Sequence, residues 1–343
     1  MAYTTINKST DYFNTKLYTG NGSTQSITGV GFQPDWVWTK QRSGTEHHNS
    51  NDAVRGATKV IFPNLTNAEQ TVSNLITNFI SDGFSVGDNA GANNNGSAYV
   101  SWNWKANGQG SSNTDGSINT TYTSVNTTAG FSISKFTGTG STATVGHGLG
   151  VVPACMIFKR ITTSGQQWTM YHKSLGNTAH ILLNTTGSKT IQTNYWNDTS
   201  PTNTVWTMGN QDEVNPNGSE VICYAFAEKT GYSKFGSYTG NGSTDGTFVY
   251  TGFKPAFVIL KRTNSTGNWQ LLDNKRLGYN VENRTIYPNS NIAEQDEDDA
   301  DLLSNGFKLK STGGDSNISG GQYIYMAFGQ SLVGSNNVPC TAR

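Results

Sequence analysis

The sequence predicts an all-β protein built from three tandem β-sandwich domains of jelly-roll or lectin-like type, with at most one or two short helices. The first observation is a seven-residue segment that occurs three times, at 18–24, 136–142 and 238–244. The second is the composition, which is dominated by Gly, Asn, Ser and Thr and includes 39 Gly and 8 Trp. Turn-rich sequences punctuated by aromatic residues favour many short strands over helices.

The copies are arranged in tandem with a regular spacing. Gly138 and Gly240 are 102 residues apart, and so are Pro153 and Pro255. A unit of about 100 residues is longer than the usual period of a solenoid repeat. We therefore expect each copy to be a domain with its own core.

The composition also suggests where the copies begin and end. The predicted parts are an N-terminal lead-in (1–11), a first copy (12–106), a linker rich in Gly, Ser, Asn and Thr (107–129), a second copy (130–228), a third copy (232–333) and a C-terminal tail (334–343). The linker has the composition of a flexible or loosely extended chain. The second and third copies are joined by a short connection, so they are expected to pack more tightly together.

Each copy opens with a turn and a central strand. Gly-Asn-Gly at 20–22 supplies a tight turn, because glycine and asparagine accept positive φ at little cost. A proline then precedes an apolar run, which is typical of a strand covered on both faces. Each proline is followed six residues later by a lysine, which we interpret as a solubilising residue at the strand end, with a binding role as the alternative. These lysines are Lys40, Lys159 and Lys261.

Each copy closes on an alternating aromatic strand. A large aromatic residue occupies the same position of this strand in all three copies, so it is predicted to lie in the core rather than to form a ligand platform. These residues are Trp104, Phe226 and Phe328.

Between these two strands the copies diverge. In the first copy, Thr66 and Glu69 have the spacing of a capping box ahead of apolar residues from 72 to 79, which predicts a helix of about three turns. The third copy instead has an acidic run over 294–301. We interpret this run as a solvated acidic face, with a Ca²⁺ site as the alternative, because Ca²⁺ prefers several carboxylate oxygens.

Charge and hydropathy exclude several classes of protein. The chain has 23 basic and 23 acidic residues, whereas a nucleic-acid-binding protein normally carries a basic excess. No segment approaches the roughly 18 apolar residues that span a bilayer, so no membrane insertion is expected. The N-terminus lacks the features of a secretory signal. Three cysteines argue against a disulfide framework.

No residue pattern indicates catalysis or a cofactor. Hydrolysis of glycans usually needs a pair of acidic residues, but Asp35 and Asp82 of the first copy are not repeated in the others. There is no Gly-x-Ser-x-Gly segment, and the histidines have no cysteine or carboxylate at metal-ligand spacing. We therefore predict a protein that is not an enzyme, has no cofactor and has no metal site, with a polysaccharide depolymerase as a minor alternative.

Five segments of the first copy together form a recognisable pattern: 18–22, 31–38, 52–57, 82–87 and 99–106. Through them the first copy resembles, over its whole length, an uncharacterised domain family that recurs, often in tandem, in structural proteins of marine tailed bacteriophages. The second and third copies match at their openings and closings but have 172–176 and 273–278 in place of the Asp-Ala-Val-Arg-Gly element at 52–56. The resemblance implies a virion component with a lectin-type β-sandwich fold and brings no catalytic residues.

These observations lead to a functional hypothesis with one main alternative. The chain is expected to be a virion structural protein, assembled in the host cytoplasm, that acts as a tail fibre or appendage and binds a host-surface glycan or receptor. The alternative is a capsid decoration, head-fibre or joining protein whose partners are other virion proteins. Because each contact would be weak, we expect a symmetric homo-oligomer, most simply a homotrimer, that gains affinity by multivalency.

The candidate ligand-binding residues are aromatic or charged. Four tryptophans in the divergent middles of the second and third copies are expected to offer stacking faces to sugar rings: Trp168, Trp196, Trp206 and Trp269. Asp52 and Arg55, from the element that is distinctive of the first copy, complete the candidate set.

Overall fold

The structure is a computed structural model that describes residues 4–276, 280 and 284–334. It confirms the all-β class: the described chain is almost entirely strands and turns, with one four-residue helix, α1 (Ala90–Asn93), and two 3₁₀ turns, η1 (Ser9–Asp11) and η2 (Thr193–Tyr195). Antiparallel pairing links all the named strands.

Each copy contributes one main sheet with a common arrangement, in which the opening strand, closing strand, central strand and next strand lie side by side. In the first copy the order is β1 (Phe13–Thr19), β9 (Ala98–Trp104), β3 (Trp36–Gln41), β4 (Asn49–Asp52). In the third copy it is β19 (Ser233–Thr239), β27 (Gln322–Gln330), β21 (Lys254–Arg262), β22 (Trp269–Asp273). The second copy has a longer sheet: β10 (Tyr122–Asn126), β11 (Phe131–Thr137), β18 (Glu220–Phe226), β13 (Cys155–Arg160), β14 (Trp168–His172), β15 (Ala179–Leu182), β16 (Thr190–Ile191).

Smaller sheets accompany the main ones. The first copy has β2 (Gln25–Thr28), β8 (Gly83–Val86) and β7 (Ile76–Ile80), with the ribbon β5 (Lys59–Val60) and β6 (Gln70–Thr71). The second has β12 (Ala143–Gly146) and β17 (Val205–Met208). The third has β20 (Phe248–Tyr250), β26 (Gly306–Leu309) and β25 (Ala300–Leu303), with the ribbon β23 (Arg284–Thr285) and β24 (Gln295–Asp296).

Alternation along the closing strands gives every main sheet two buried faces. In β18, Tyr224 and Phe226 point into a core shared by all three copies, while Cys223 and Ala225 point into a core that belongs to the second copy alone. The first and third copies have corresponding separate cores beneath their own small sheets. Each main sheet is therefore sandwiched between a private core and the shared core.

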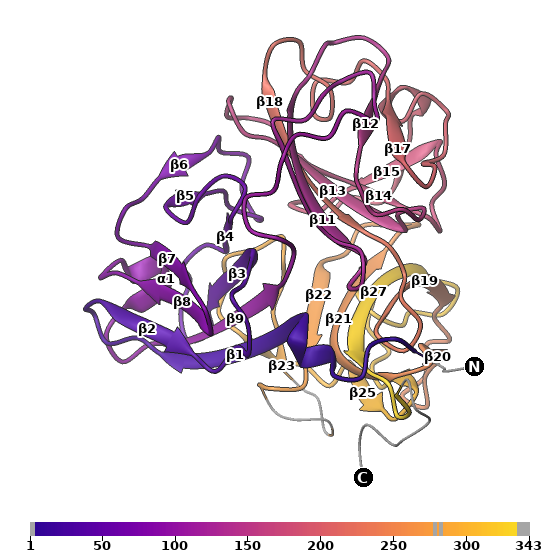
Figure 1. Cartoon of the computed structure of the whole chain (residues 1–343). Helices are drawn as coiled ribbons and strands as arrows, with labels where there is room; N and C mark the ends of the chain where they lie inside the picture. The colour runs from indigo at the N-terminus through magenta and orange to yellow at the C-terminus, as the bar shows by residue number, and fades with distance from the viewer. Residues whose placement is uncertain (1–3, 277–279, 281–283, 335–343) are drawn as a thin grey trace.

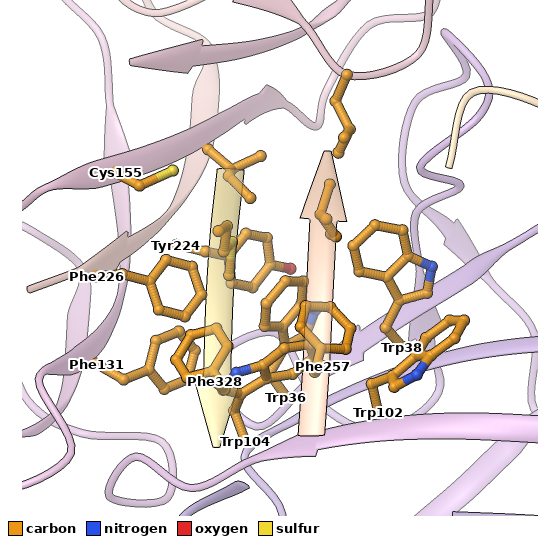
Figure 2. Close-up of a cluster of buried hydrophobic side chains, with 14 of the residues drawn as sticks. Trp36, Trp38, Trp102, Trp104, Phe131, Cys155, Tyr224, Phe226, Phe257 and Phe328 are labelled. Atoms are coloured by element: carbon orange, nitrogen blue, oxygen red, sulfur yellow. The ribbon is translucent and has the colours of Figure 1, made fainter. Parts of the chain in front are cut away.

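The three closing-strand aromatics meet at the middle of the shared core. Trp104, Phe226 and Phe328 are buried, as predicted from the sequence, and they contact one another pairwise with ring centroids 5.7–6.4 Å apart. Figure 2 shows these rings with Trp36, Phe131 and Phe257 packed around them. The same position from three copies thus converges on one point, which defines an approximate threefold arrangement within a single chain.

Equivalent contacts join neighbouring copies and close the arrangement into a ring, seen in Figure 1 as three lobes around one centre. Main-chain N–H groups of Glu69, Lys189 and Glu294 donate to the carbonyls of Ile161, Thr263 and Arg42, at 2.8, 3.1 and 2.9 Å. These bonds link the first copy to the second, the second to the third, and the third back to the first. Arg42 also makes a two-pronged ion pair with Glu294, with both N···O distances at 2.9 Å.

The segment at 107–129, whose composition suggests a flexible linker, is instead held to the body. It contains strand β10, which pairs with β11 along its whole length. The buried Asp35 carboxylate accepts main-chain hydrogen bonds from Ala106 and Gly108 at 2.6 and 2.9 Å, which fixes the start of the segment. The short polar side chains of this segment form hydrogen bonds in turns and beside strands, so the segment is ordered although its composition is that of a flexible linker.

The N-terminal lead-in also lies against the body. Gln330 at the end of β27 accepts from the Ser9 main chain at 2.7 Å and donates to the Asn7 carbonyl at 3.1 Å. Ile6 is buried in the shared core. The described part of the lead-in is therefore docked onto the third copy.

The helix predicted from 66 onward is wrong, because the structure has β6, a turn and β7 there. The Glu69 N–H donates to the second copy, and the Glu69 carboxylate pairs with Arg55 at 3.2 Å. Both groups that would close a capping box are therefore used in other contacts. The apolar residues read as a helical face instead cover the small sheet: Leu75 and Ile76 lie in the private core of the first copy, and Val72 and Phe79 pack against it.

Candidate functional site

Asp52 and Arg55 form a buried ion pair at the junction of the first and second copies. The Arg55 Nε lies 2.6 Å from Asp52 Oδ2, and its other nitrogens reach Glu69 and the Ser50 carbonyl. The Tyr224 hydroxyl of the second copy donates to Asp52 at 2.6 Å. Both side chains of the pair are almost fully buried, so they act as a structural tie between copies.

The third copy repeats this arrangement, which corrects the expectation that the element is lost there. Arg276 Nε lies 2.7 Å from Asp273, and Arg276 reaches Glu294 and the Leu271 carbonyl just as Arg55 reaches Glu69 and Ser50. Asp273 accepts a hydrogen bond from Trp102 of the first copy at 3.0 Å. Only Asp and Arg, three residues apart, are needed, so the intervening residues differ.

In the second copy a histidine replaces the Asp–Arg pair. His172 Nδ1 accepts from the Ser174 N–H at 3.2 Å, and its Nε2 lies 3.1 Å from the Tyr325 carbonyl of the third copy. Burial lowers the pKa of His172 to about 4, so the ring is neutral at physiological pH, with Nε2–H as the donor. At the junction of the second and third copies, a neutral ring that donates and accepts hydrogen bonds thus takes the place that an ion pair holds at the other two junctions.

The three repeated lysines are buried, which corrects their interpretation as solubilising residues. Lys159 Nζ donates to the carbonyls of Thr66 and Gln166 at 3.2 and 2.6 Å, and Lys261 Nζ donates to those of Thr186 and Gly267 at 3.1 and 2.9 Å. Thr66 and Thr186 belong to the preceding copy, so these lysines pin the neighbouring loop. Burial lowers the pKa of each of Lys40, Lys159 and Lys261 from 10.5 to about 8.

Trp168 and Trp269 bridge adjacent copies and offer no face to a ligand. Each indole N–H donates at 2.9 Å to a main-chain carbonyl of the preceding copy, Phe62 for Trp168 and Leu182 for Trp269. His48 holds the corresponding place in the first copy and contacts the Tyr287 carbonyl of the third. The Trp168 and Trp269 rings both belong to the shared core.

Trp196 and Trp206 lie in the private core of the second copy. The Trp196 indole donates to the Ala179 carbonyl at 2.9 Å, and Trp206 stacks on His147 with ring centroids 6.1 Å apart. All four candidate tryptophans are at most 2 % exposed, so the proposed sugar-stacking surface is not made of these residues. These tryptophans of the divergent middles fill the cores and do not lie on loops open to solvent.

A repeated asparagine that the sequence reasoning missed organises the opening turn. Asn93, Asn215 and Asn317 are fully buried. Each side-chain oxygen accepts a main-chain N–H from the turn, at Asn21, Thr139 and Asn241 (2.9, 2.8 and 3.1 Å), and each side-chain nitrogen donates to the carbonyl of Ser23, Ser141 or Ser243. Asn215 and Asn317 have the same 102-residue spacing as the other repeated positions, which was the available signal.

This asparagine explains the first glycine of the repeated segment. A Cβ at Gly20, Gly138 or Gly240 would lie 2.2–2.4 Å from the carbonyl oxygen of the residue after the asparagine. The turn and the asparagine segment therefore approach too closely for any larger residue. The glycine-rich turn has a structural role and is not a phosphate loop.

Two aromatic side chains are exposed on the third copy. Phe248 and Tyr250 lie on the edge strand β20, and among the described residues they are the exposed aromatics, at 45 % and 54 %. They are two residues apart and so project from the same face of the small sheet. The Lys234 ammonium lies 5.1 Å from the Tyr250 ring centroid.

The glycine at the start of β26 supports this aromatic pair. Tyr250 is directly opposite Gly306 in the register, and the Phe248 ring lies so close to Gly306 that a Cβ there would be 3.0 Å from two ring carbons. Phe248 therefore rests on the glycine backbone. Beside Tyr250, a pocket of about 300 Å³ is lined by Gly252, Asn305 and Leu332. We call Phe248 and Tyr250 the aromatic platform.

The described residues hold no group of three or more His, Cys, Asp or Glu side chains that could bind a metal ion. Cys155 and Cys223 are buried free thiols. In the part of the chain that the structure describes, no helix has the length and apolar character needed to cross a bilayer.

The fold and these contacts define a class: an all-β protein in which three homologous copies close around a common aromatic core. A family profile, described as a domain of unknown function (DUF7483), matches residues 8–331. The chain therefore belongs to this family, whose unit spans all three copies. No curated protein matches the chain.

Proposed function

We propose that the protein is a structural component of a tailed-phage virion, a tail fibre or appendage protein that binds host-surface glycan without chemical turnover. The resemblance of the first copy to domains of marine phage structural proteins supports the virion assignment. Much of the chemistry that might otherwise suggest catalysis, including both Asp–Arg pairs, Lys159 and Lys261, is used in contacts between copies. The proposal of glycan binding therefore rests on side chains that are exposed at the surface.

The observation that carries glycan binding is the aromatic platform. Phe248 and Tyr250 expose apolar faces side by side on an edge strand, and Tyr250 and Lys234 add a hydroxyl and an ammonium. An aromatic face with a polar rim suits a sugar ring, which has an apolar face of C–H groups and an edge of hydroxyls. Sugar contacts of this kind are weak singly, which agrees with a role in multivalent attachment.

The test replaces both platform residues. The variant F248A/Y250A is expected to stay folded with a small loss in unfolding temperature, because both side chains are about half exposed and lie outside the buried cores, and to lose at least tenfold in binding to host cells or extracted surface polysaccharide. Ile191→Ala is the matched control, since Ile191 is 73 % exposed on the second copy. Equal binding by F248A/Y250A and the natural protein would contradict the platform as receptor site.

A second candidate is a capsid decoration or joining protein with only virion partners. The observation that favours it is the approximate threefold arrangement of one chain, which matches the local threefold positions of an icosahedral shell. Labelled-protein electron microscopy of the particle separates the two candidates, because it places the protein on the tail or on the head. We also propose the homotrimer expected from the sequence. Light scattering tests it, because a trimer has the molar mass of three chains and a monomer has that of one.

A further inference from the structure

The three junctions between neighbouring copies are built from equivalent positions, and the junction of the second and third copies contains a pocket. The main-chain hydrogen bonds that close the ring begin at Glu69, Lys189 and Glu294, so these residues hold the same place at the three junctions. The pocket has a volume of about 300 Å³. Leu175 and Lys189 of the second copy line it together with Ser237 of the third.

At the junction of the first and second copies, the corresponding place is occupied by ion pairs. Glu69 lies 3.2 Å from Arg55 of the same copy. On the facing edge of the second copy, Lys135 pairs with Glu220 at 2.8 Å. Each charge at this junction therefore has a partner of opposite sign.

The junction of the third and first copies is also occupied. Arg42 and Arg276 lie 2.9 and 3.3 Å from the Glu294 carboxylate. Glu294 begins the acidic run that is expected from the sequence to be solvated, but its side chain is only 7 % exposed. At the position that corresponds to Lys135, the first copy has Leu17, which packs against the shared core.

The junction of the second and third copies differs at all four positions. Ser237 and Gln322 stand 102 residues after Lys135 and Glu220, at the same places in the register of the opening and closing strands. The turn that follows His172 is closed by the Gly176 N–H, as the turn after Asp52 is closed by the Gly56 N–H. The replacements are Arg55 by Leu175, Glu69 by Lys189, Lys135 by Ser237 and Glu220 by Gln322.

These replacements leave a positive charge in the pocket without a partner. Lys189 is the basic residue of the lining, which contains no carboxylate. In the part of the chain that the structure describes, no ion pair includes Lys189. The chain has therefore removed the ion pairs of the other junctions here and kept one cation.

The other polar groups of the pocket are accessible and uncommitted. Ser174, Ser237 and Thr239 are exposed, and their hydroxyls form no hydrogen bond with any residue in the described ranges. Lys189 and Leu175 are half-buried, so both can meet a ligand. The pocket thus combines a cation, several hydroxyls and an apolar side chain.

We propose that this pocket binds a monosaccharide unit that carries one negatively charged group, either a carboxylate or a sulfate. The charged group accepts a hydrogen bond from the Lys189 ammonium, which strengthens the contact. Hydroxyls of the sugar can donate to and accept from the serine and threonine hydroxyls, and Leu175 offers a contact to the C–H face of the ring. The volume is at the lower end of the range of about 300–1,000 Å³ that is typical of small-molecule sites. The proposal goes beyond the aromatic platform and does not depend on it.

Calorimetric titration of the full-length protein at pH 7 tests the ligand chemistry. At least one of glucuronate and glucose 6-sulfate is expected to bind tenfold or more tightly than glucose, which has the same ring without the charge. Tighter binding of glucuronate would identify a carboxylate as the preferred group, and tighter binding of glucose 6-sulfate would identify a sulfate. If neither charged sugar binds more tightly than glucose, or if acetate and inorganic sulfate bind as tightly as the charged sugars, the proposal is wrong.

Substitution of the lysine tests the location. Lys189→Met removes the ammonium and keeps an unbranched side chain, so it is expected to weaken binding of the charged sugar by at least tenfold and to leave the protein folded. Lys275→Met is the matched control, because Lys275 is an exposed lysine of the third copy that does not line the pocket. Unchanged binding by Lys189→Met would overturn the assignment.

Two further variants separate the pocket from other sites. Ser237→Leu introduces the residue that the first copy has at this position, Leu17, so the protein is expected to fold with the pocket filled and to lose charged-sugar binding. Full binding by Ser237→Leu would contradict the proposal. F248A/Y250A is expected to bind the charged sugar normally, and a loss in this variant would place the ligand at the platform instead.

Discussion

The buried lysines show how a repeated residue can mislead when it is read from sequence alone. A lysine at a strand end is usually exposed, and nothing in the local sequence of Lys159 indicates otherwise. The loop carbonyl that holds it comes from Thr66, which lies 93 residues earlier in the preceding copy. Recurrence in all three copies was the one available signal of a structural role. The same reasoning applies to Trp168 and Trp269, whose partners also lie in another copy.

These lysines should make stability rise with pH on the alkaline side. The folded-state pKa of about 8 lies below the value of 10.5 for an unperturbed lysine, so between these values the unfolded state binds more protons. Stability therefore increases as pH rises through this window. From pH 7.5 to 9.5 the free energy of unfolding is expected to increase by about 1–2 kcal/mol per lysine.

Chemical denaturation at the two pH values measures this effect. Lys159→Met is expected to reduce the increase, whereas Lys59→Met, at a partly exposed position, should leave it unchanged. The window stays below pH 10, because the buried tyrosines oppose the trend once unfolded tyrosine begins to ionise. If the free energy of unfolding falls between pH 7.5 and 9.5, the claim that burial lowers the pKa of these lysines in the folded protein is contradicted.

At the scale of elements, the sequence predicts strands well and their supporting polar contacts poorly. The central and closing strands were recognisable from their apolar and alternating runs, and the aromatic at 104, 226 and 328 was correctly placed in the core. The helix predicted near Glu69 failed because that residue bonds to Ile161 in the next copy, which no local pattern reveals. The role of Asn215 is not evident from the sequence, because a buried asparagine has the same local pattern as an exposed turn residue.

Removing this asparagine should loosen the turn that it holds. Asn215→Ala leaves the Thr139 N–H and the carbonyls of Ser141 and Gly209 without their buried partner. We expect a loss of at least about 2 kcal/mol in the free energy of unfolding. Asn217→Ala, on the exposed side of the same segment, should cost less than about 0.5 kcal/mol. If the two variants have similar free energies of unfolding in urea denaturation, the Asn215 side chain does not hold the turn.

At the scale of the whole molecule, the three copies behave as one body. Tandem repetition predicted three units, but it could not show that they share a core, because repeats joined end to end and repeats closed in a ring have the same sequence spacing. The ring is visible only in cyclic contacts such as Arg42 with Glu294, which brings the first copy against the third. The family profile likewise spans the three copies together.

Closure around the aromatic centre formed by Trp104, Phe226 and Phe328 predicts cooperative unfolding. Exposing the shared core of one copy would leave the facing surfaces of the other two in water, so no copy should unfold alone. Differential scanning calorimetry of the full-length protein tests this most directly. We expect a single transition whose calorimetric enthalpy equals its van't Hoff enthalpy. Two or three separate transitions, with a calorimetric enthalpy well above the van't Hoff value, would contradict a ring built on one core.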